Sequence, residues 1–261
     1  MKNRHVFALL LGLAPFLLQF LSPRAFSSAD HPTVTLEAAL DYAALSAEGN
    51  DTAVLKVSLL PTHHYLPSDR PPLNLAIVLD RSGSMNGAKI EMAKRAIQRA
   101  FQSLQPNDFV SIVAYNNSAK TLLPLTQVRN VRNPRDYTDR IHANGGTAIY
   151  AGVNLGAAQL RPALEDSAGI NRILLLSDGL ANEGPSSVRD FQLLGQSLSR
   201  EGITVSTIGL GLGYNEDLMS GLSAAGQGNV YFVETANDLP RIFDSELGDA
   251  SSIVARDAVI E

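Results

Sequence analysis

Uninterrupted apolar runs alternate with amphipathic stretches through the middle of the chain. Residues 73–79 and 171–177 are apolar with little alternation and end in turn-forming residues, a pattern typical of strands buried on both faces of a sheet. Residues 89–104 instead carry apolar side chains at helical spacing, with Lys89 and Lys94 among the basic residues expected on the outer face. This alternation predicts an α/β fold with a doubly wound, mostly parallel sheet and helices on both faces.

Further segments continue the same alternation. The pattern predicts strands at residues 109–114, 122–125, 204–210 and 229–233, and helices at residues 135–142, 149–160, 187–200 and 239–247. Asn215 is expected to cap one more helix that begins at Glu216.

The regions that flank this core differ in pattern. Residues 33–43 and 55–59 alternate apolar and polar positions around a turn, which predicts an antiparallel hairpin, although the alanine-rich first half could be helical instead. Residues 61–72 hold four prolines and predict a linker. The last residues are again partly apolar. We therefore expect four parts: a signal peptide at 1–29, the hairpin and linker at 30–71, the main domain at 72–248, and a flanking strand at 249–261, which could begin a further β domain of a longer protein.

The first residues have the pattern of an export signal. A basic start is followed by a mostly apolar run at residues 6–21 and by the small residues Ser27, Ser28 and Ala29, which predicts a secretory signal peptide cleaved after Ala29. The run is short for a helix that spans a membrane. We expect an exported protein, periplasmic or extracellular, with membrane contact only if this segment is retained.

Charge and cysteine content narrow the classes of partner. The chain has 21 Lys and Arg against 26 Asp and Glu, a formal charge of −5. The segment removed by the expected cleavage contains basic residues but no Asp or Glu, so the mature chain would be more negative. This balance argues against nucleic acid as a partner. The chain has no Cys, so disulfides do not stabilise it.

Three short polar clusters stand where apolar runs end. They are the turn of residues 80–84, the turn of residues 144–147, and the residue after the run 171–177. Because ligands bind beyond the carboxyl ends of strands in such sheets, we expect five side chains to converge there: Asp80, Ser82, Ser84, Thr147 and Asp178.

The five side chains form an all-oxygen donor set of three hydroxyls and two carboxylates. With no Cys in the chain and no His close to the clusters, this set favours a hard cation, Mg²⁺ first and Mn²⁺ or Ca²⁺ next. Such an ion is only partly neutralised by the protein. It could therefore accept a carboxylate from another molecule.

At these residues the chain resembles the von Willebrand factor A domain with its metal-ion-dependent adhesion site. The family pattern of Asp-x-Ser-x-Ser, a distant Thr and a distant Asp is complete, and the similarity runs from about residue 72 to about residue 248. The resemblance implies that Ser82, Ser84 and Thr147 touch the metal through their hydroxyls. It implies that Asp80 and Asp178 hold the metal mostly through water.

The same resemblance implies a binding module for adhesion or assembly, not an enzyme. Its metal would recruit an Asp or Glu side chain of a partner protein. The loops at residues 84–86, 144–147 and 179–184 would form a rim that selects the partner. Arg81 would either add positive potential for the incoming carboxylate or be a solvated turn residue.

Two other kinds of chemistry match parts of the same motifs. Residues 83–89 lie where a phosphate-binding loop would lie, but Ile90 follows Lys89 where such a loop needs Ser or Thr, so no nucleotide is expected. A Mg²⁺-dependent phosphoester hydrolase is the alternative. Ser82 stands where such enzymes need a second acid, and His142 is the one base candidate near the motifs. A membrane-tethered subunit of a larger complex also stays open.

Overall fold

The fold is described by a computed structural model that covers seven stretches of the chain: residues 34–40, 54–61, 71–165, 169–178, 181–211, 214–233 and 238–251. The chain divides into two compact units, Met1–His63 and His64–Glu261. The expected signal peptide, most of the linker and residues 252–261 lie outside the described residues.

The smaller unit contains the predicted hairpin. Strand β1 (Val34–Leu40) pairs antiparallel with β2 (Leu55–Pro61), with Val34 opposite Pro61 and Leu40 opposite Leu55. The strand prediction is confirmed over these residues, and the helical alternative for residues 34–40 is excluded.

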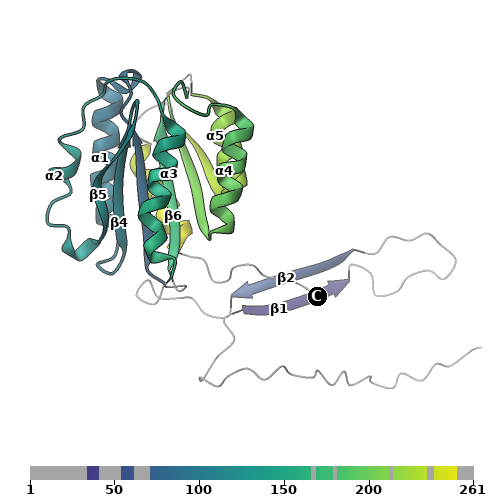
Figure 1. Cartoon of the computed structure of the whole chain (residues 1–261). Helices are drawn as coiled ribbons and strands as arrows, with labels where there is room; N and C mark the ends of the chain where they lie inside the picture. Colours follow the sequence, from purple (N-terminus) through teal and green to yellow (C-terminus); the bar gives the residue numbers. More distant parts are fainter. Residues whose placement is uncertain are drawn as a thin grey trace, which may run out of the picture. The chain divides into compact units, whose positions relative to one another are not determined.

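The larger unit is built on a six-stranded sheet (Figure 1). The strand order is β5-β4-β3-β6-β7-β8, and only β5 runs antiparallel to its neighbour. The strands are β3 (Leu73–Asp80), β4 (Phe109–Tyr115), β5 (Ala119–Gln127), β6 (Ile170–Ser177), β7 (Ile203–Leu210) and β8 (Gln227–Val233). The mostly parallel sheet of the prediction is confirmed. Because β3 lies between β4 and β6, the strand order reverses here, and the carboxyl ends of β3 and β6 border the crevice where such sheets bind ligands.

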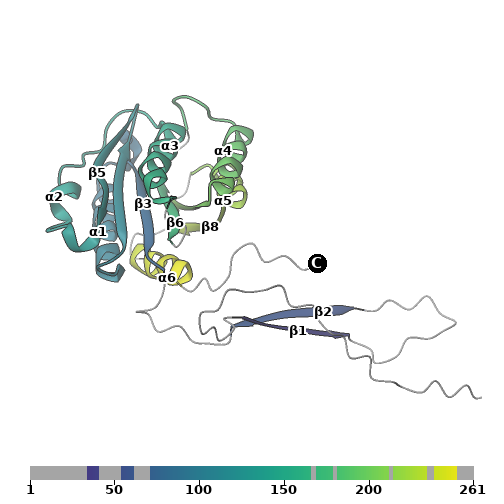
Figure 2. The same cartoon turned by 60° about the horizontal axis from the view of Figure 1, so that its bottom comes forward.

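Helices cover both faces of this sheet (Figures 1 and 2). The helices are α1 (Ala88–Ser103), α2 (Arg135–Thr138), α3 (Ile149–Leu160), α4 (Val188–Arg200), α5 (Glu216–Ala225) and α6 (Leu239–Ser251). Short 3₁₀ turns occur at Gly83–Met85, Val128–Asn130 and Arg161–Ala163. The helices α1 and α6 pack against each other on one face, and α3, α4 and α5 lie on the other.

The core is divided by the sheet into two layers. Ile77 and Leu79 of β3 join the cluster that includes α1 and α6, whereas Ala76 and Val78 join the cluster that includes α3, α4 and α5. Alternate residues of one strand are thus buried against opposite helix layers. This is why residues 73–79 are apolar without alternation.

Several helix ends follow local signals. The Asn215 side chain accepts a hydrogen bond from Leu218 N at 3.1 Å, which confirms the predicted cap of α5. Ser187 and Asp190 form a reciprocal capping box at the start of α4.

Two helices differ in length from the sequence-based expectation. The helix expected at residues 135–142 ends at Thr138, and a turn follows in which Ile141 N donates to Thr138 O at 3.0 Å. Further along, Asn144 N donates to Arg81 O at 2.8 Å. The last helix continues to Ser251, so residues 249–251 are helical. The rest of the flanking strand expected at 249–261 lies outside the described residues.

The two lysines expected on the outer face of α1 are not simply solvated. Lys94 is buried and its Nζ pairs with Glu91 Oε1 at 2.9 Å. Lys89 is half-buried and bonds to a strand-end carboxylate, described below. The outer-face prediction is therefore wrong for Lys94, because a long lysine stem can pack against apolar surface while its charged end reaches a partner.

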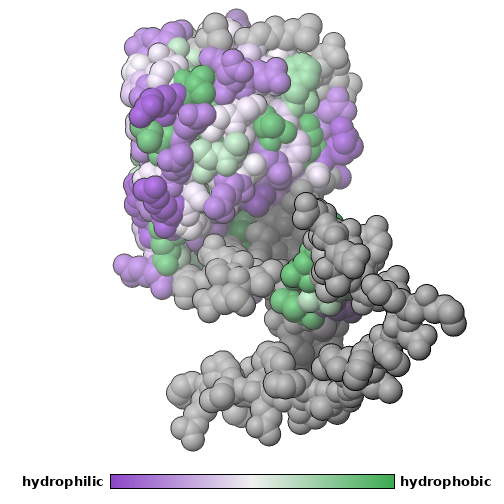
Figure 3. Space-filling view, turned by 90° about the vertical axis from the view of Figure 1, so that its right-hand side faces the viewer, coloured by the Kyte–Doolittle hydropathy of each residue, from purple (hydrophilic) through white to green (hydrophobic). Residues whose placement is uncertain are grey.

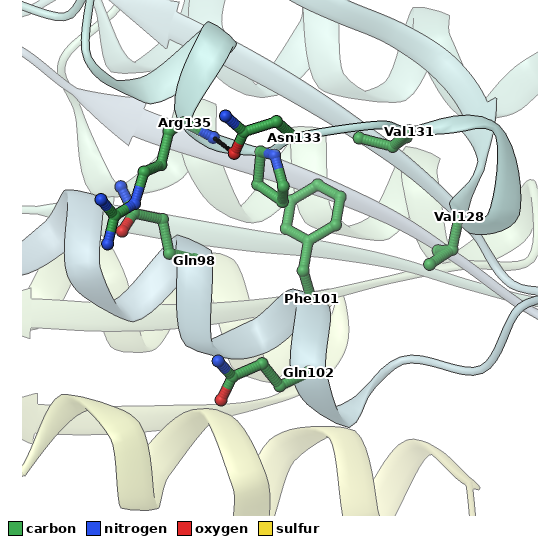
Figure 4. A pocket seen from close by; sticks show the side chains of 8 residues that line it. Gln98, Phe101, Gln102, Val128, Val131, Asn133 and Arg135 are labelled. Carbon is green, nitrogen blue, oxygen red and sulfur yellow. Dashed lines mark hydrogen bonds between the residues drawn. The ribbon is translucent and has the colours of Figure 1, made fainter.

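The surface of the larger unit offers few large apolar side chains. Hydrophilic and hydrophobic residues are interspersed on its face in Figure 3, and Leu193, Val230 and Phe232 are its large apolar side chains exposed among the described residues. A hollow of about 360 Å³ lies between α1 and the segment before α2, where Phe101 points toward Asn133 (Figure 4). Within the described ranges, no helix combines the length and apolar character needed to cross a membrane.

Candidate metal centre

Four of the five expected side chains lie in one hydrogen-bond network. Asp80 ends β3, Ser82 and Ser84 occupy the turn after it, and Asp178 follows β6. Ser82 Oγ lies 3.0 Å from Ser84 Oγ, and Ser84 Oγ donates to Asp178 Oδ1 at 2.7 Å. Ser82 N donates to Asp80 Oδ1 at 2.7 Å, which shapes the turn. The structure therefore brings Asp80, Ser82, Ser84 and Asp178 together at the carboxyl end of the sheet.

Thr147 lies in a loop that is bound to the same turn. Gly83 N donates to Gly145 O at 3.0 Å, and Thr147 N donates to Asn182 Oδ1 at 2.8 Å. The Thr147 residue is only 3% exposed. Within the described residues, no hydrogen bond joins its hydroxyl to the other four side chains. The backbone contacts place its loop beside them.

Asp80 is a buried carboxylate at the end of β3. Its residue is fully buried, and no basic side chain in the described part of the chain forms an ion pair with it. Burial raises the pKa of the Asp80 carboxyl above its ordinary value. Hydrogen bonds from Ser177 Oγ, at 2.6 Å, and from Ser82 oppose that rise, while the negative charge of Asp178 adds to it. A nearby cation would stabilise the ionised form of this buried carboxylate.

Lys89 is a residue of this site that the sequence motifs do not identify. It stands in the first turn of α1, and its Nζ forms an ion pair with Asp178 Oδ2. The Asp178 side chain is fully buried, and the Lys89 side chain is 38% exposed. The signal that could have identified Lys89 is its position one helical turn after the motif, at the same edge of the sheet.

Asparagines from a further loop were also missed. Asn116 Nδ2 donates to Asn144 Oδ1 at 2.7 Å, and Asn117 Oδ1 accepts from Gly146 N at 3.1 Å. Gly145 has φ 75°, and a Cβ there would lie 2.2 Å from Asn117 Oδ1, so the tight turn requires glycine. The polar run directly after β4 was the available signal for this support.

Arg81 supports the loop that carries Thr147. It is half-buried, and its Nη1 donates to Asn144 Oδ1 at 3.0 Å and to His142 O at 3.5 Å. Arg81 is therefore more than a solvated turn residue. The His142 residue itself is exposed.

The donor set fits a hard divalent cation. Among the described residues, no group of three or more His, Asp and Glu side chains could hold a metal, and the chain has no Cys. The candidate centre depends instead on hydroxyls, with two carboxylates to compensate charge. This chemistry suits Mg²⁺, Mn²⁺ or Ca²⁺ better than metals that prefer nitrogen and sulfur ligands.

The chain belongs to the von Willebrand factor type A domain family, whose model matches residues 74–245. Domains of this family are typically protein-interaction modules and are generally not enzymes. Their metal-ion-dependent adhesion site, or MIDAS, binds divalent metals. The predicted fold and family are thus confirmed.

Two bacterial relatives are longer than this chain. It is 35% identical over 174 residues to "Uncharacterized protein sll0103" of Synechocystis, covering 67% of this chain and 40% of the relative. It is 28% identical over 222 residues to "Uncharacterized protein YfbK" of Escherichia coli, covering 84% of this chain and 38% of the relative. The match thus spans about two fifths of each relative.

Solved structures show the same fold. A von Willebrand factor type A protein from Catenulispora acidiphila gives a TM-score of 0.67 at 22% identity, covering 87% of this chain and 52% of that protein. Proximal thread matrix protein 1 from the mussel byssus, with a zinc-occupied MIDAS motif, gives a TM-score of 0.56 at 18% identity, covering 70% of this chain and 46% of that protein.

Proposed function

We propose that this chain is a divalent-metal-dependent protein-binding module that acts in adhesion or assembly. Asp80, Ser82, Ser84, Thr147 and Asp178 would hold Mg²⁺, with Mn²⁺ or Ca²⁺ as alternatives. The observation that carries the proposal is the network of Ser82, Ser84 and Asp178 beside a buried Asp80 that has no basic partner among the described residues.

The five residues would play two chemical roles at the ion. Ser82, Ser84 and Thr147 would offer neutral hydroxyl oxygens, while Asp80 and Asp178 would compensate charge, mostly through water. The ion, when bound, would supply an electrophilic centre for one carboxylate oxygen of an Asp or Glu of a partner protein. The exposed residues Asn86, Asn144 and Glu183 border this centre in sequence and would belong to the rim that selects the partner.

One observation supports metal binding at this motif, and another bears on which metal binds. The byssus protein with the same fold has zinc at its MIDAS motif, which supports a metal at this motif. The donor set of this chain contains no nitrogen or sulfur ligand, which favours Mg²⁺ over zinc here.

Export belongs to the same proposal. A mature chain that begins at Asp30, after removal of residues 1–29, would meet its protein partner outside the cytoplasm. N-terminal sequencing of the protein from its source cells tests this step, and a chain that still begins at Met1 would contradict it.

A capture experiment tests the binding function. The chain is immobilised and exposed to extract from its source cells in Mg²⁺ or in EDTA, and the captured proteins are identified. We expect a partner that is captured in Mg²⁺ and absent both in EDTA and with Asp80→Ala. Asp108→Asn is the matched control, because Asp108 is a buried aspartate away from the site that accepts from Leu73 N at 2.9 Å. Partners that bind equally under all these conditions would contradict the proposal.

Lys89→Met is expected to tighten Mg²⁺ binding. The Lys89 ammonium pairs with Asp178 and so competes with a second cation for the same carboxylate. Removing a competing charge at this partly solvated position should lower the Kd for Mg²⁺ about tenfold. Isothermal titration calorimetry measures the change, with Lys94→Met, which removes a lysine of the same helix that pairs with Glu91, as the control. An unchanged or weaker affinity in Lys89→Met would mean that Lys89 does not compete.

A further inference from the structure

A pocket lined by more basic than acidic residues lies beside the candidate metal centre. It has a volume of about 560 Å³, and Arg81, Lys120 and Arg140 line it together with one acid, Asp136. We call it the basic pocket. Arg81 directly follows Asp80 in the chain, so one wall of the basic pocket begins at the metal-binding turn.

The sheet register gives the backbone separation between the end of β3, at the candidate metal centre, and Lys120 of the basic pocket. Leu79 of β3 lies opposite Ala114 of β4, and Ala114 lies opposite Lys120 of β5. Lys120 is therefore two strands away from the end of β3, about 10 Å at the usual spacing between strands. An extended peptide advances roughly 3.3 Å per residue, so about three residues cover this distance.

Two of the three basic side chains of the basic pocket are available to a ligand. Lys120 and Arg140 are exposed, and their side chains form no hydrogen bond or ion pair with any described residue. Asp136 Oδ1 accepts from Asn133 Nδ2 at 3.2 Å. The chain as a whole has a formal charge of −5, whereas three basic residues and one acid line this pocket, so its local charge is opposite in sign. An acidic ligand is the chemistry that this local charge attracts.

We propose that the basic pocket binds a second acidic side chain of the partner protein, about three residues along from the one recruited by the metal. The partner segment is then extended and carries two carboxylates at that spacing. Lys120 and Arg140 select for the second carboxylate, and Arg81 lies between the two positions. This inference rests on the proposed function, because the metal centre fixes the first carboxylate.

Two synthetic peptides probe the basic pocket. Acetyl-Gly-Asp-Gly-Gly-Asp-Gly-amide carries two acids at the required spacing, and the same peptide with Asn in place of the second Asp carries one. Each is titrated into the full chain in Mg²⁺ and in EDTA, and the Kd is obtained from NMR chemical shifts. In Mg²⁺ we expect the two-acid peptide to bind about threefold more tightly, the size expected for one or two solvated ion pairs.

Variants connect this difference to the basic pocket. Lys120→Gln/Arg140→Gln should abolish the advantage of the two-acid peptide and leave the one-acid peptide unaffected. Arg129→Gln/Arg200→Gln removes the same charge from exposed residues at the opposite end of the sheet, after β5 and at the end of α4, and should preserve the advantage.

The outcomes separate this inference from the proposed function. Equal affinities for the two peptides in Mg²⁺, with both lost in EDTA, would overturn the role of the basic pocket and leave the proposed function standing. An advantage that survives in Lys120→Gln/Arg140→Gln would also overturn it. If neither peptide bound in Mg²⁺, or if both bound equally well in EDTA, the proposed function would be overturned and this inference with it.

Discussion

We expect Asp80→Asn to weaken the binding of Mg²⁺ to this chain strongly. Asp80 is fully buried, and its two oxygens accept from Ser82 N and Ser177 Oγ. The amide keeps the size of the side chain but removes the charge that would balance a cation. We expect the affinity for Mg²⁺ to fall by about 100-fold, the upper range for a lost group that supports metal ligands.

The same variant should be at least as stable as the parent chain in EDTA. A neutral amide removes a buried charge that has no cationic partner among the described residues. Thermal unfolding with and without saturating Mg²⁺ measures both effects. Asp108→Asn should keep the full rise in Tm with Mg²⁺. A rise of the same size in Asp80→Asn would contradict the role assigned to Asp80.

Arg172→Met will strongly destabilise the larger unit. Arg172 of β6 forms a buried ion pair with Glu246 of α6, whose side chain is fully buried. Glu246 Oε2 also accepts from Tyr231 Oη at 2.7 Å and from Asn229 Nδ2 at 3.1 Å. Removing the guanidinium leaves a buried carboxylate without its cation, which costs about 3–5 kcal/mol of unfolding free energy.

Denaturant unfolding with a matched surface pair tests this cost. Arg161→Met removes an arginine that pairs with Glu201 at 2.8 Å but is 46% exposed, and should cost less than about 1 kcal/mol. Arg172→Met/Glu246→Leu should recover much of the lost stability, because no isolated charge remains. Equal losses in the Arg172 and Arg161 variants would show that burial of the first pair does not govern its contribution.

The same pair predicts a dependence of stability on pH. Burial alone would raise the pKa of Glu246, but Arg172 and the hydrogen bonds from Ser206, Tyr231 and Asn229 outweigh it and lower that pKa below its ordinary value of 4.5. The folded chain therefore favours the ionised form. Its contribution to stability is present above pH 4.5 and is lost as the pH falls through the lowered pKa. In Glu246→Gln this part of the acid sensitivity should be absent from unfolding curves measured at falling pH.

The sequence predicts the layered fold because burial determines which positions along the chain are apolar. Residues 73–79 face a helix layer on each side of the sheet, so every position is apolar, whereas α1 shows helical spacing because only one of its faces packs. Asn215 is identified as a cap because capping is a contact between near neighbours in the chain. The convergence of Asp80, Ser82, Ser84 and Asp178 follows from their positions at the ends of adjacent parallel strands.

Contacts between residues far apart in the chain cannot be recognised from the local pattern of apolar and polar positions. The ion pair between Arg172 and Glu246 joins positions 74 residues apart, and the pair between Lys89 and Asp178 joins positions 89 apart. The hydrogen bond from Asn144 N to Arg81 O likewise joins residues 63 positions apart, and periodicity cannot reveal it. Local pattern predicts which face of an element is buried. It does not predict which long polar side chain reaches across to another element.

Anomalous X-ray scattering from crystals grown with Mn²⁺ tests the central claim most directly, because it locates the ion without reference to binding or stability. We expect one strong peak among the hydroxyl oxygens of Ser82, Ser84 and Thr147, with Asp80 and Asp178 around it. No peak there at saturating Mn²⁺, or a peak only elsewhere on the chain, would contradict the claim that these five side chains hold a divalent ion.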